Sequence, residues 1–256
     1  KPVEPEGLPV IPPTPRKPGI RTASLLLRVG TKMVEAALEP DCIAKEMRRT
    51  PDQIDAQVDR MMADDRALET TANFVDAIPL SATSVAAVEC VSGKCRVVAG
   101  AVYDPYRDEL FGAAYGKGAW VETAGKRTPL AVSASTLGDA IVYAGAPPGM
   151  RALKPSLRGI AAVAPHVRTM RLLGSAAIML AYVAAGRGAA YFECDLAAWD
   201  TAAGALLVEE AGGTVTDADG APYTPLTRQI VAAGACHGDL RALVDTVGGA
   251  RLDDED

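Results

Sequence analysis

The sequence has few aromatic residues and few histidines, and it lacks the short motifs of several enzyme classes. Of 256 residues, 5% are aromatic and two are histidines, and no serine-nucleophile motif, nucleotide-binding glycine loop or zinc-ligand spacing occurs. No apolar run reaches the ~18 residues of a membrane span, and no charged-then-apolar leader opens the chain. A net charge of −6 argues against sequence-independent nucleic-acid binding. These absences predict a soluble protein without a membrane span or a nucleic-acid partner.

The remaining composition is that of a folded globular protein. Apolar residues make up 49% of the chain and charged residues 23%, which is too apolar for a disordered chain. At roughly 150 residues per domain, the length suggests one large domain or two small ones. The first residue is Lys1, so we expect a processed or trimmed chain.

The cysteines indicate the compartment. Five are dispersed and mostly set in apolar runs: Cys42, Cys90, Cys95, Cys194 and Cys236. An odd, dispersed set favours reduced thiols over a secreted disulfide framework, although Cys90 and Cys95 could pair across a hairpin. We expect a reducing compartment, either the cytoplasm or an organelle interior reached by removal of a targeting peptide.

Both ends of the chain differ from its centre. Residues 1–21 form a proline-rich arm, with seven of the chain's 18 prolines in its first 18 residues. Proline fixes φ and lacks a donor, so the arm is predicted to be extended. It is either a disordered tail or a docking strap anchored by Leu8, Val10 and Ile11. Residues 251–256 form an acidic, solvated tail.

The first half of the chain is predicted to contain helices followed by an antiparallel meander. Apolar residues recur at three- and four-residue steps from Thr22 until just before Pro40, and a second helix is expected over residues 50–63. Residues 84–105 alternate in polarity around a Ser-Gly-Lys turn, which predicts a hairpin. A second strand pair is expected over residues 109–123, where glycines supply the bend.

The second half alternates between strands and helices, which predicts a mixed sheet with helices on its faces. Strands are expected near residues 140–145, 166–172, 189–193, 213–217 and 230–234, and helices near residues 156–162, from Ser175 onward and at 199–211.

Four consecutive segments, residues 73–79, 100–120, 171–193 and 199–220, resemble the inositol monophosphatase family of metal-dependent sugar phosphatases. The resemblance covers roughly residues 23–245. It implies an α/β fold, the layered α-β-α-β-α sandwich shared with fructose-bisphosphatase. The corresponding domain would span residues 22–250, with subdomains of about 22–147 and 148–250.

Three residues in the later segments carry candidate functions. Asp200 begins an Ala-rich helix, where the helix dipole stabilises a carboxylate; it is by itself an N-cap, and the resemblance implies a Mg²⁺ ligand. Glu193 is by itself an exposed strand-end glutamate, and the resemblance implies contact with a sugar hydroxyl. Ser175 would lie at a helix start and contact the substrate, although the small residues beside it also permit close packing.

The first metal-binding signature departs from the family's pattern. Aligned through Asn73 and Phe74, the family's first aspartate is Arg66, its second is Glu69 and its glycine is Thr70. Glu69 could still bind the metal, although it reaches one methylene further. The upstream loop that carries the family's Glu-Glu pair is absent from the expected position.

Other acidic residues near this signature offer weaker alternatives. Asp65, next to Asp64, could replace the lost aspartate only if the register slipped by one residue. Asp59 resembles a family aspartate on the second helix, where a surface carboxylate is the simpler account.

Arg66 decides the functional expectation. A unit charge pair about 4 Å apart is worth about 4 kcal/mol at an effective dielectric of ~20, so replacing a carboxylate beside Mg²⁺ by a guanidinium loses roughly 8 kcal/mol of attraction. Without the metal, phosphoryl transfer loses its main catalytic contributions. Arg66 with Thr70 and Thr71 could instead bind an anion such as phosphate.

We therefore expect a non-catalytic scaffold or accessory subunit without a cofactor, which contacts other protein subunits through the arm of residues 1–21. The family resemblance also makes a homodimer plausible. The alternative is an active Mg²⁺-dependent phosphatase acting on inositol phosphate or a related sugar or nucleotide phosphate monoester. Its metal ligands would then be Glu69, Asp200 and Asp65.

Overall fold

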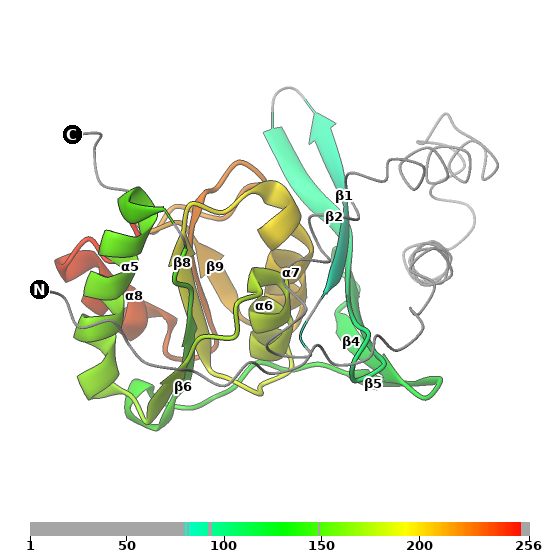
Figure 1. The fold of residues 1–256 in the computed structure, drawn as a ribbon. Helices are drawn as coiled ribbons and strands as arrows, with labels where there is room; N and C mark the ends of the chain where they lie inside the picture. Colours follow the sequence, from blue (N-terminus) through cyan, green and yellow to red (C-terminus); the bar gives the residue numbers. More distant parts are fainter. Residues whose placement is uncertain (1–79, 81, 92–93, 148, 252–256) are drawn as a thin grey trace, which may run out of the picture.

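The computed structural model describes residue 80 and residues 82–91, 94–147 and 149–251. The two helices predicted before residue 64, the arm of residues 1–21 and residues 252–256 lie outside this part of the chain. The described residues form two five-stranded sheets with helices between them and on one outer face (Figure 1). The predicted subdomain boundary near residue 147 stays a prediction.

The first sheet is an antiparallel meander with the strand order β1-β2-β3-β4-β5. Its strands are β1 (Thr83–Val91), β2 (Lys94–Asp104), β3 (Glu109–Ala114), β4 (Ala119–Thr123) and β5 (Lys126–Pro129). Both predicted hairpins are confirmed, and Gly116 and Gly118 supply the second bend with φ values of 67° and 80°. The sequence did not predict β5, because all four of its residues are exposed and show no alternation of apolar and polar residues.

The hairpin formed by β1 and β2 carries a disulfide bond between Cys90 and Cys95. The strand register places the two residues opposite each other, with their Cα atoms 4.1 Å apart. The expectation of five reduced thiols is therefore wrong for this pair. Cys194 and Cys236 are buried and form no disulfide bond, as their apolar surroundings predicted.

The second sheet is mixed, as predicted, with the strand order β7-β6-β8-β10-β9. Its strands are β6 (Ile141–Ala144), β7 (Thr169–Arg171), β8 (Ala190–Cys194), β9 (Thr214–Thr216) and β10 (Gln229–Ala233). The central strand β6 runs parallel to β7 and β8, whereas β10 is antiparallel to β8 and β9. Strands β6, β7 and β8 therefore end at the same edge of the sheet.

Helices cover both faces of this mixed sheet (Figure 1). They are α5 (Met150–Val163), α6 (Ala176–Ala184), α7 (Ala198–Glu210) and α8 (His237–Thr246), with short 3-10 turns at Leu137–Asp139 and Ala164–His166. Helices α6 and α7 lie between the two sheets, and α5 and α8 lie on the outer face of the mixed sheet. None of the helices in the described ranges is long and apolar enough to cross a membrane.

The central helices are buried on nearly all sides because their residues are small or apolar all round. Glycines allow the close contacts: a Cβ on Gly100 of β2 would lie 2.8 Å from the Cα of Ala203, and one on Gly204 would lie 2.5 Å from the Cβ of Leu180. The order helices, sheet, helices, sheet matches the predicted layered sandwich. The predicted outermost helical layer falls on residues outside the described part of the chain.

Candidate functional site

The carboxyl edge of the mixed sheet brings together the candidate residues that the structure describes. Helix α6 follows β7 and helix α7 follows β8, so both helices begin at the edge where these parallel strands end. Helix N-termini carry unsatisfied N–H groups and partial positive charge, which favours anions. In open α/β sheets this edge is the usual place for a ligand.

Glu193 lies near the end of β8 and is only 9% exposed. Its Oε2 accepts a hydrogen bond of 2.5 Å from the hydroxyl of Tyr191. Gly145, just past β6, lies against the carboxyl group, since a Cβ there would be 1.7 Å from Glu193 Cδ. The expectation of an exposed glutamate is therefore wrong, because the side chain is buried and its carboxyl group lies against the backbone just past β6.

The surroundings of Glu193 shift the pKa of its carboxyl group upward. Burial raises the pKa of the Glu193 carboxyl, the hydrogen bond from Tyr191 lowers it, and the negative charge of Asp200 raises it again. The charge of Asp200 thus acts on the Glu193 carboxyl group in a partly desolvated place at this edge. Such a pair is typical of a functional site, although structural pairs also shift pKa values.

Asp200 is the third residue of α7 rather than its N-cap, which is Ala197. The predicted N-cap position is therefore wrong, but the side chain still caps the helix: its Oδ2 accepts a 2.9 Å hydrogen bond from the N–H of Ala197. This bond fixes the half-buried carboxylate at the helix start and leaves the second oxygen for another partner.

The described residues do not complete a magnesium site on their own. Carboxylates are suitable Mg²⁺ ligands, yet no group of three or more His, Cys, Asp or Glu side chains that could hold a metal occurs in this part of the chain. The expected partner ligand Glu69, the disrupting Arg66 and the anion-binding Thr70 and Thr71 all lie outside the described residues, as do Asp59, Asp64 and Asp65.

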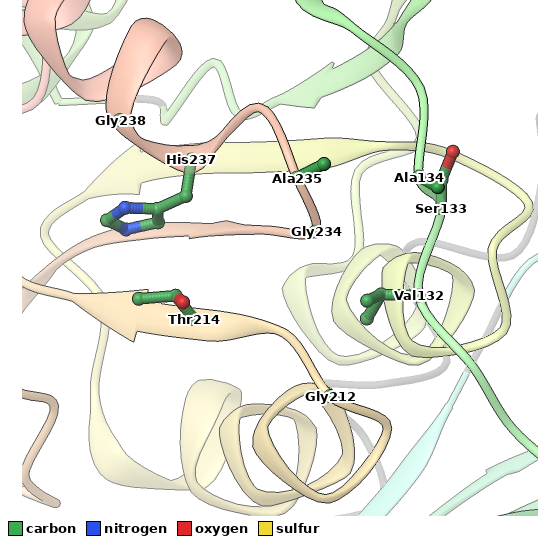
Figure 2. A pocket seen from close by; sticks show the side chains of 9 residues that line it. All are labelled: Val132, Ser133, Ala134, Gly212, Thr214, Gly234, Ala235, His237 and Gly238. Carbon is green, nitrogen blue, oxygen red and sulfur yellow. The ribbon is translucent and has the colours of Figure 1, made fainter.

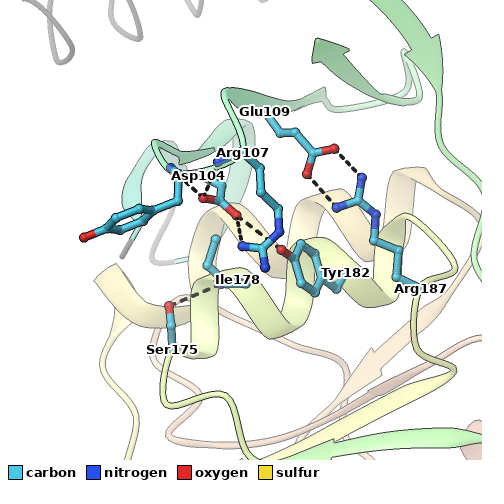
Figure 3. Close-up of polar contacts among 8 residues, drawn as sticks. Asp104, Arg107, Glu109, Ser175, Ile178, Tyr182 and Arg187 are labelled. Atoms are coloured by element: carbon cyan, nitrogen blue, oxygen red, sulfur yellow. Dashed lines mark hydrogen bonds and ion pairs between the residues drawn. The ribbon is translucent and has the colours of Figure 1, made fainter. Parts of the chain in front are cut away.

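Ser175 is the N-cap of α6, which confirms the predicted helix start. Its hydroxyl oxygen accepts a 3.4 Å hydrogen bond from the N–H of Ile178 (Figure 3). The side chain therefore faces the first turn of the helix at the same edge of the sheet. Its expected contact with a substrate stays a prediction.

Further along α6, a buried carboxylate joins the helix to the first sheet (Figure 3). Asp104 accepts hydrogen bonds from the N–H groups of Tyr106 and Arg107, from Arg107 Nη1 at 2.9 Å and from the hydroxyl of Tyr182 at 3.2 Å. Arg187, just past the helix, forms a two-pronged ion pair with Glu109 at 2.5 and 2.6 Å. With both oxygens engaged, Asp104 serves as a structural group.

A separate hollow of about 560 Å³ lies at the opposite edge of the mixed sheet (Figure 2). It is lined by Val132, Ser133, Ala134, Gly212, Thr214, Gly234, Ala235, His237 and Gly238. Burial lowers the pKa of His237, whose Nε2 lies 3.1 Å from Thr216 Oγ1. The hollow contains neither Glu193 nor Asp200.

The sequence interpretation missed two residues of the site, Tyr191 and Gly145. The signal for Tyr191 was its spacing, because residues two apart on a strand share one face. Gly145 lies directly after a predicted strand, where a glycine often marks the close approach of another group.

Comparisons with known proteins agree with this architecture. The model of the "Inositol monophosphatase family" matches residues 68–247. Inositol-1-monophosphatase of Mesorhizobium japonicum is 40% identical over 157 residues, 60% of this chain and 55% of that protein. The Nus factor SuhB of Escherichia coli K12 is 40% identical over 166 residues, 64% of this chain and 60% of that protein. The chain thus spans little more than half the length of these curated relatives.

Solved structures give the same result. SuhB of Mycobacterium tuberculosis matches with a TM-score of 0.64 and 28% identity, covering 90% of this chain and 93% of that one. The extragenic suppressor protein suhB of Bartonella henselae matches with a TM-score of 0.60 and 37% identity, covering 68% of this chain and 66% of that one. These findings confirm the resemblance and the predicted fold.

Proposed function

Because the chain belongs to the inositol monophosphatase family, we propose that it is a non-catalytic member that serves as a scaffold or accessory subunit of a larger protein assembly. In this proposal the edge that carries Glu193 and Asp200 remains a ligand-binding site without efficient hydrolysis. The arm of residues 1–21 and a second copy of the chain are the proposed protein contacts.

The observation that carries this proposal is the sequence at the first metal-binding signature. In the resemblance to the family, Arg66 takes the position of the first aspartate of this signature. A guanidinium beside a divalent cation repels it, whereas an aspartate attracts it. At an effective dielectric of ~20, each pair of unit charges about 4 Å apart contributes about 4 kcal/mol, and the loss of that attraction is enough to empty a weak metal site. Relatives named Nus factor SuhB support a role alongside other proteins.

The second candidate is an active Mg²⁺-dependent phosphatase acting on inositol phosphate or a related sugar or nucleotide phosphate monoester. The observation that favours it is the described edge itself, where Glu193 and Asp200 interact beside the first turns of two helices. Asp200 and Glu69 would hold the magnesium ion, which would supply a Lewis acid and an activated water. Glu193 would accept a hydrogen bond from a ligand hydroxyl, and Ser175 would lie near the bound molecule.

One pair of assays distinguishes the candidates. Phosphate release from inositol 1-phosphate is measured with and without Mg²⁺ for the full chain and for Asp200→Asn. The first proposal expects no Mg²⁺-dependent release; release that is lost in Asp200→Asn would overturn it and support the phosphatase. Light scattering after sizing then compares the full chain with a chain lacking residues 1–21. The same number of subunits in both would count against a role of the arm in self-assembly.

Anion binding without metal is tested on the same preparations. The proposal that Arg66, Thr70 and Thr71 bind phosphate expects a higher thermal midpoint in inorganic phosphate with EDTA present. An Arg66→Ala variant would lose that increase. A midpoint that does not respond to phosphate would count against this site.

A further inference from the structure

Tyr191 has a feature that core packing does not require. Its side chain is completely buried within the apolar cluster between the two sheets. Its hydroxyl nevertheless donates a 2.5 Å hydrogen bond to Glu193 Oε2. A phenylalanine would fill nearly the same core volume, so the hydroxyl group must be explained by the carboxyl group that it holds.

Gly145 restricts the same carboxyl group from another side. A Cβ at this position would lie 1.7 Å from Glu193 Cδ and 1.9 and 2.0 Å from its two oxygens. The carboxyl group therefore packs directly against the backbone just past β6. The strand pairing is consistent with this contact, because Ala144 of β6 is in register with Phe192 of β8.

The two contacts leave one oxygen of Glu193 with a defined role. Oε2 accepts the hydrogen bond from Tyr191. Oε1 belongs to the same carboxyl group, which is held by Tyr191 and Gly145, and it can accept a hydrogen bond from a ligand. A rigid acceptor loses little conformational entropy when a ligand donates to it. A buried acceptor also discriminates strongly between ligands that supply a hydroxyl and those that do not.

We propose that Tyr191 is a positioning residue: its hydroxyl holds Oε2 of Glu193 so that Oε1 is aimed at a hydroxyl group of a cyclic polyol phosphate. This inference rests on the ligand-contact role of Glu193 proposed above. It does not require hydrolysis, because it concerns binding of the polyol portion. The phosphate portion would be bound elsewhere at the same edge and would not depend on Tyr191.

The test compares two probes by calorimetry on the full chain, myo-inositol 1-phosphate and inorganic phosphate, under identical buffer and Mg²⁺ conditions. The variants are Tyr191→Phe and, as a matched control, Tyr143→Phe, which removes a hydroxyl from the paired residue of the neighbouring strand. We expect the wild type to prefer inositol phosphate. Tyr191→Phe should weaken inositol phosphate binding about tenfold, the effect of losing one well-placed hydrogen bond. Its affinity for inorganic phosphate should be unchanged, and Tyr143→Phe should keep both affinities.

Each other outcome overturns the inference. Equal loss for both probes in Tyr191→Phe would indicate a general structural role, and an unchanged preference would indicate that the hydroxyl does not position Glu193. A wild type that binds neither probe, or binds both equally, would overturn the inference together with the ligand role of Glu193. The assembly proposal is measured separately by sizing, so its failure is distinguishable from these results.

Discussion

Glu210 offers a direct test of how the central helix layer is attached to the first sheet. It is the last residue of α7, and its Oε1 and Oε2 accept hydrogen bonds of 2.7 Å from the N–H groups of Gly116 and Gly118. Both glycines lie in the turn between β3 and β4 with positive φ. The carboxylate thus clamps a turn whose N–H groups would otherwise face solvent. Replacing Glu210 by alanine removes both bonds.

The expected loss follows from these two contacts. A hydrogen bond to a charged group contributes about 1.5–3 kcal/mol when buried, and exposure at this surface reduces each bond to about 1 kcal/mol. Glu210→Ala should therefore lower the free energy of unfolding by about 2 kcal/mol, or the thermal midpoint by about 4–8 °C for a domain of this size. Glu210→Gln keeps one acceptor and should lose about half as much.

The measurement is urea unfolding followed by circular dichroism, with thermal melts in parallel. Glu209→Ala is the control, because it removes an exposed carboxylate from the adjacent position of the same helix. A Glu210→Ala variant as stable as the Glu209→Ala control would refute the clamp. Equal losses for alanine and glutamine would show that charge matters rather than the two acceptors.

Three further predictions concern stability. Because the pKa of Glu193 is raised in the folded state, the folded protein binds this proton more tightly than the unfolded chain. The free energy of unfolding should therefore fall as the pH rises from the ordinary glutamate pKa through the raised one. Glu193→Gln should flatten this part of the stability-pH curve, and an unchanged slope would contradict the assignment. Replacing Cys90 and Cys95 together by alanine should cost about 2 kcal/mol, the chain-entropy value for a short loop, and a reductant should produce the same loss in the wild type but none in the variant. Gly100→Ala should destabilise by about 1–3 kcal/mol because its Cβ would meet the backbone of Ala203 at 2.8 Å, whereas Gly138→Ala, with nothing within 4 Å, should be nearly neutral in the same melts.

The sequence predicted the fold well where local pattern and tertiary environment agree. The alternating residues of the two hairpins became β1 to β4, and the helix after Ser175 begins where expected because its N-cap and its apolar run point to the same place. Strand β5 escaped prediction because its residues are all exposed and its pairing comes from β4 alone. Helix α5 begins earlier than the apolar pattern indicated, at Met150, and includes Pro155.

The candidate site was predicted less completely, for a different physical reason. The positions of Glu193 and Asp200 followed from the family resemblance, but their environments depend on contacts between strands that are distant in sequence. The carboxyl group of Glu193 lies against Gly145, which directly follows the neighbouring strand β6. The disulfide likewise depends on strand register, which places Cys90 opposite Cys95; the predicted hairpin allowed this pairing, whereas the count of cysteines favoured reduced thiols.

The packing of α7 connects the fold to the site. Gly100 and Gly204 let this helix approach β2 and α6 closely, and Glu210 attaches its last turn to the first sheet. Its first turn carries Asp200, whose charge acts on Glu193 across the edge of the second sheet. Because α7 is held against the first sheet and against α6, a shift along its axis would change the distance between the two carboxyl groups. The small residues of α7 therefore contribute to the geometry of the site as well as to the core, and we expect core substitutions there to change ligand affinity before they unfold the chain.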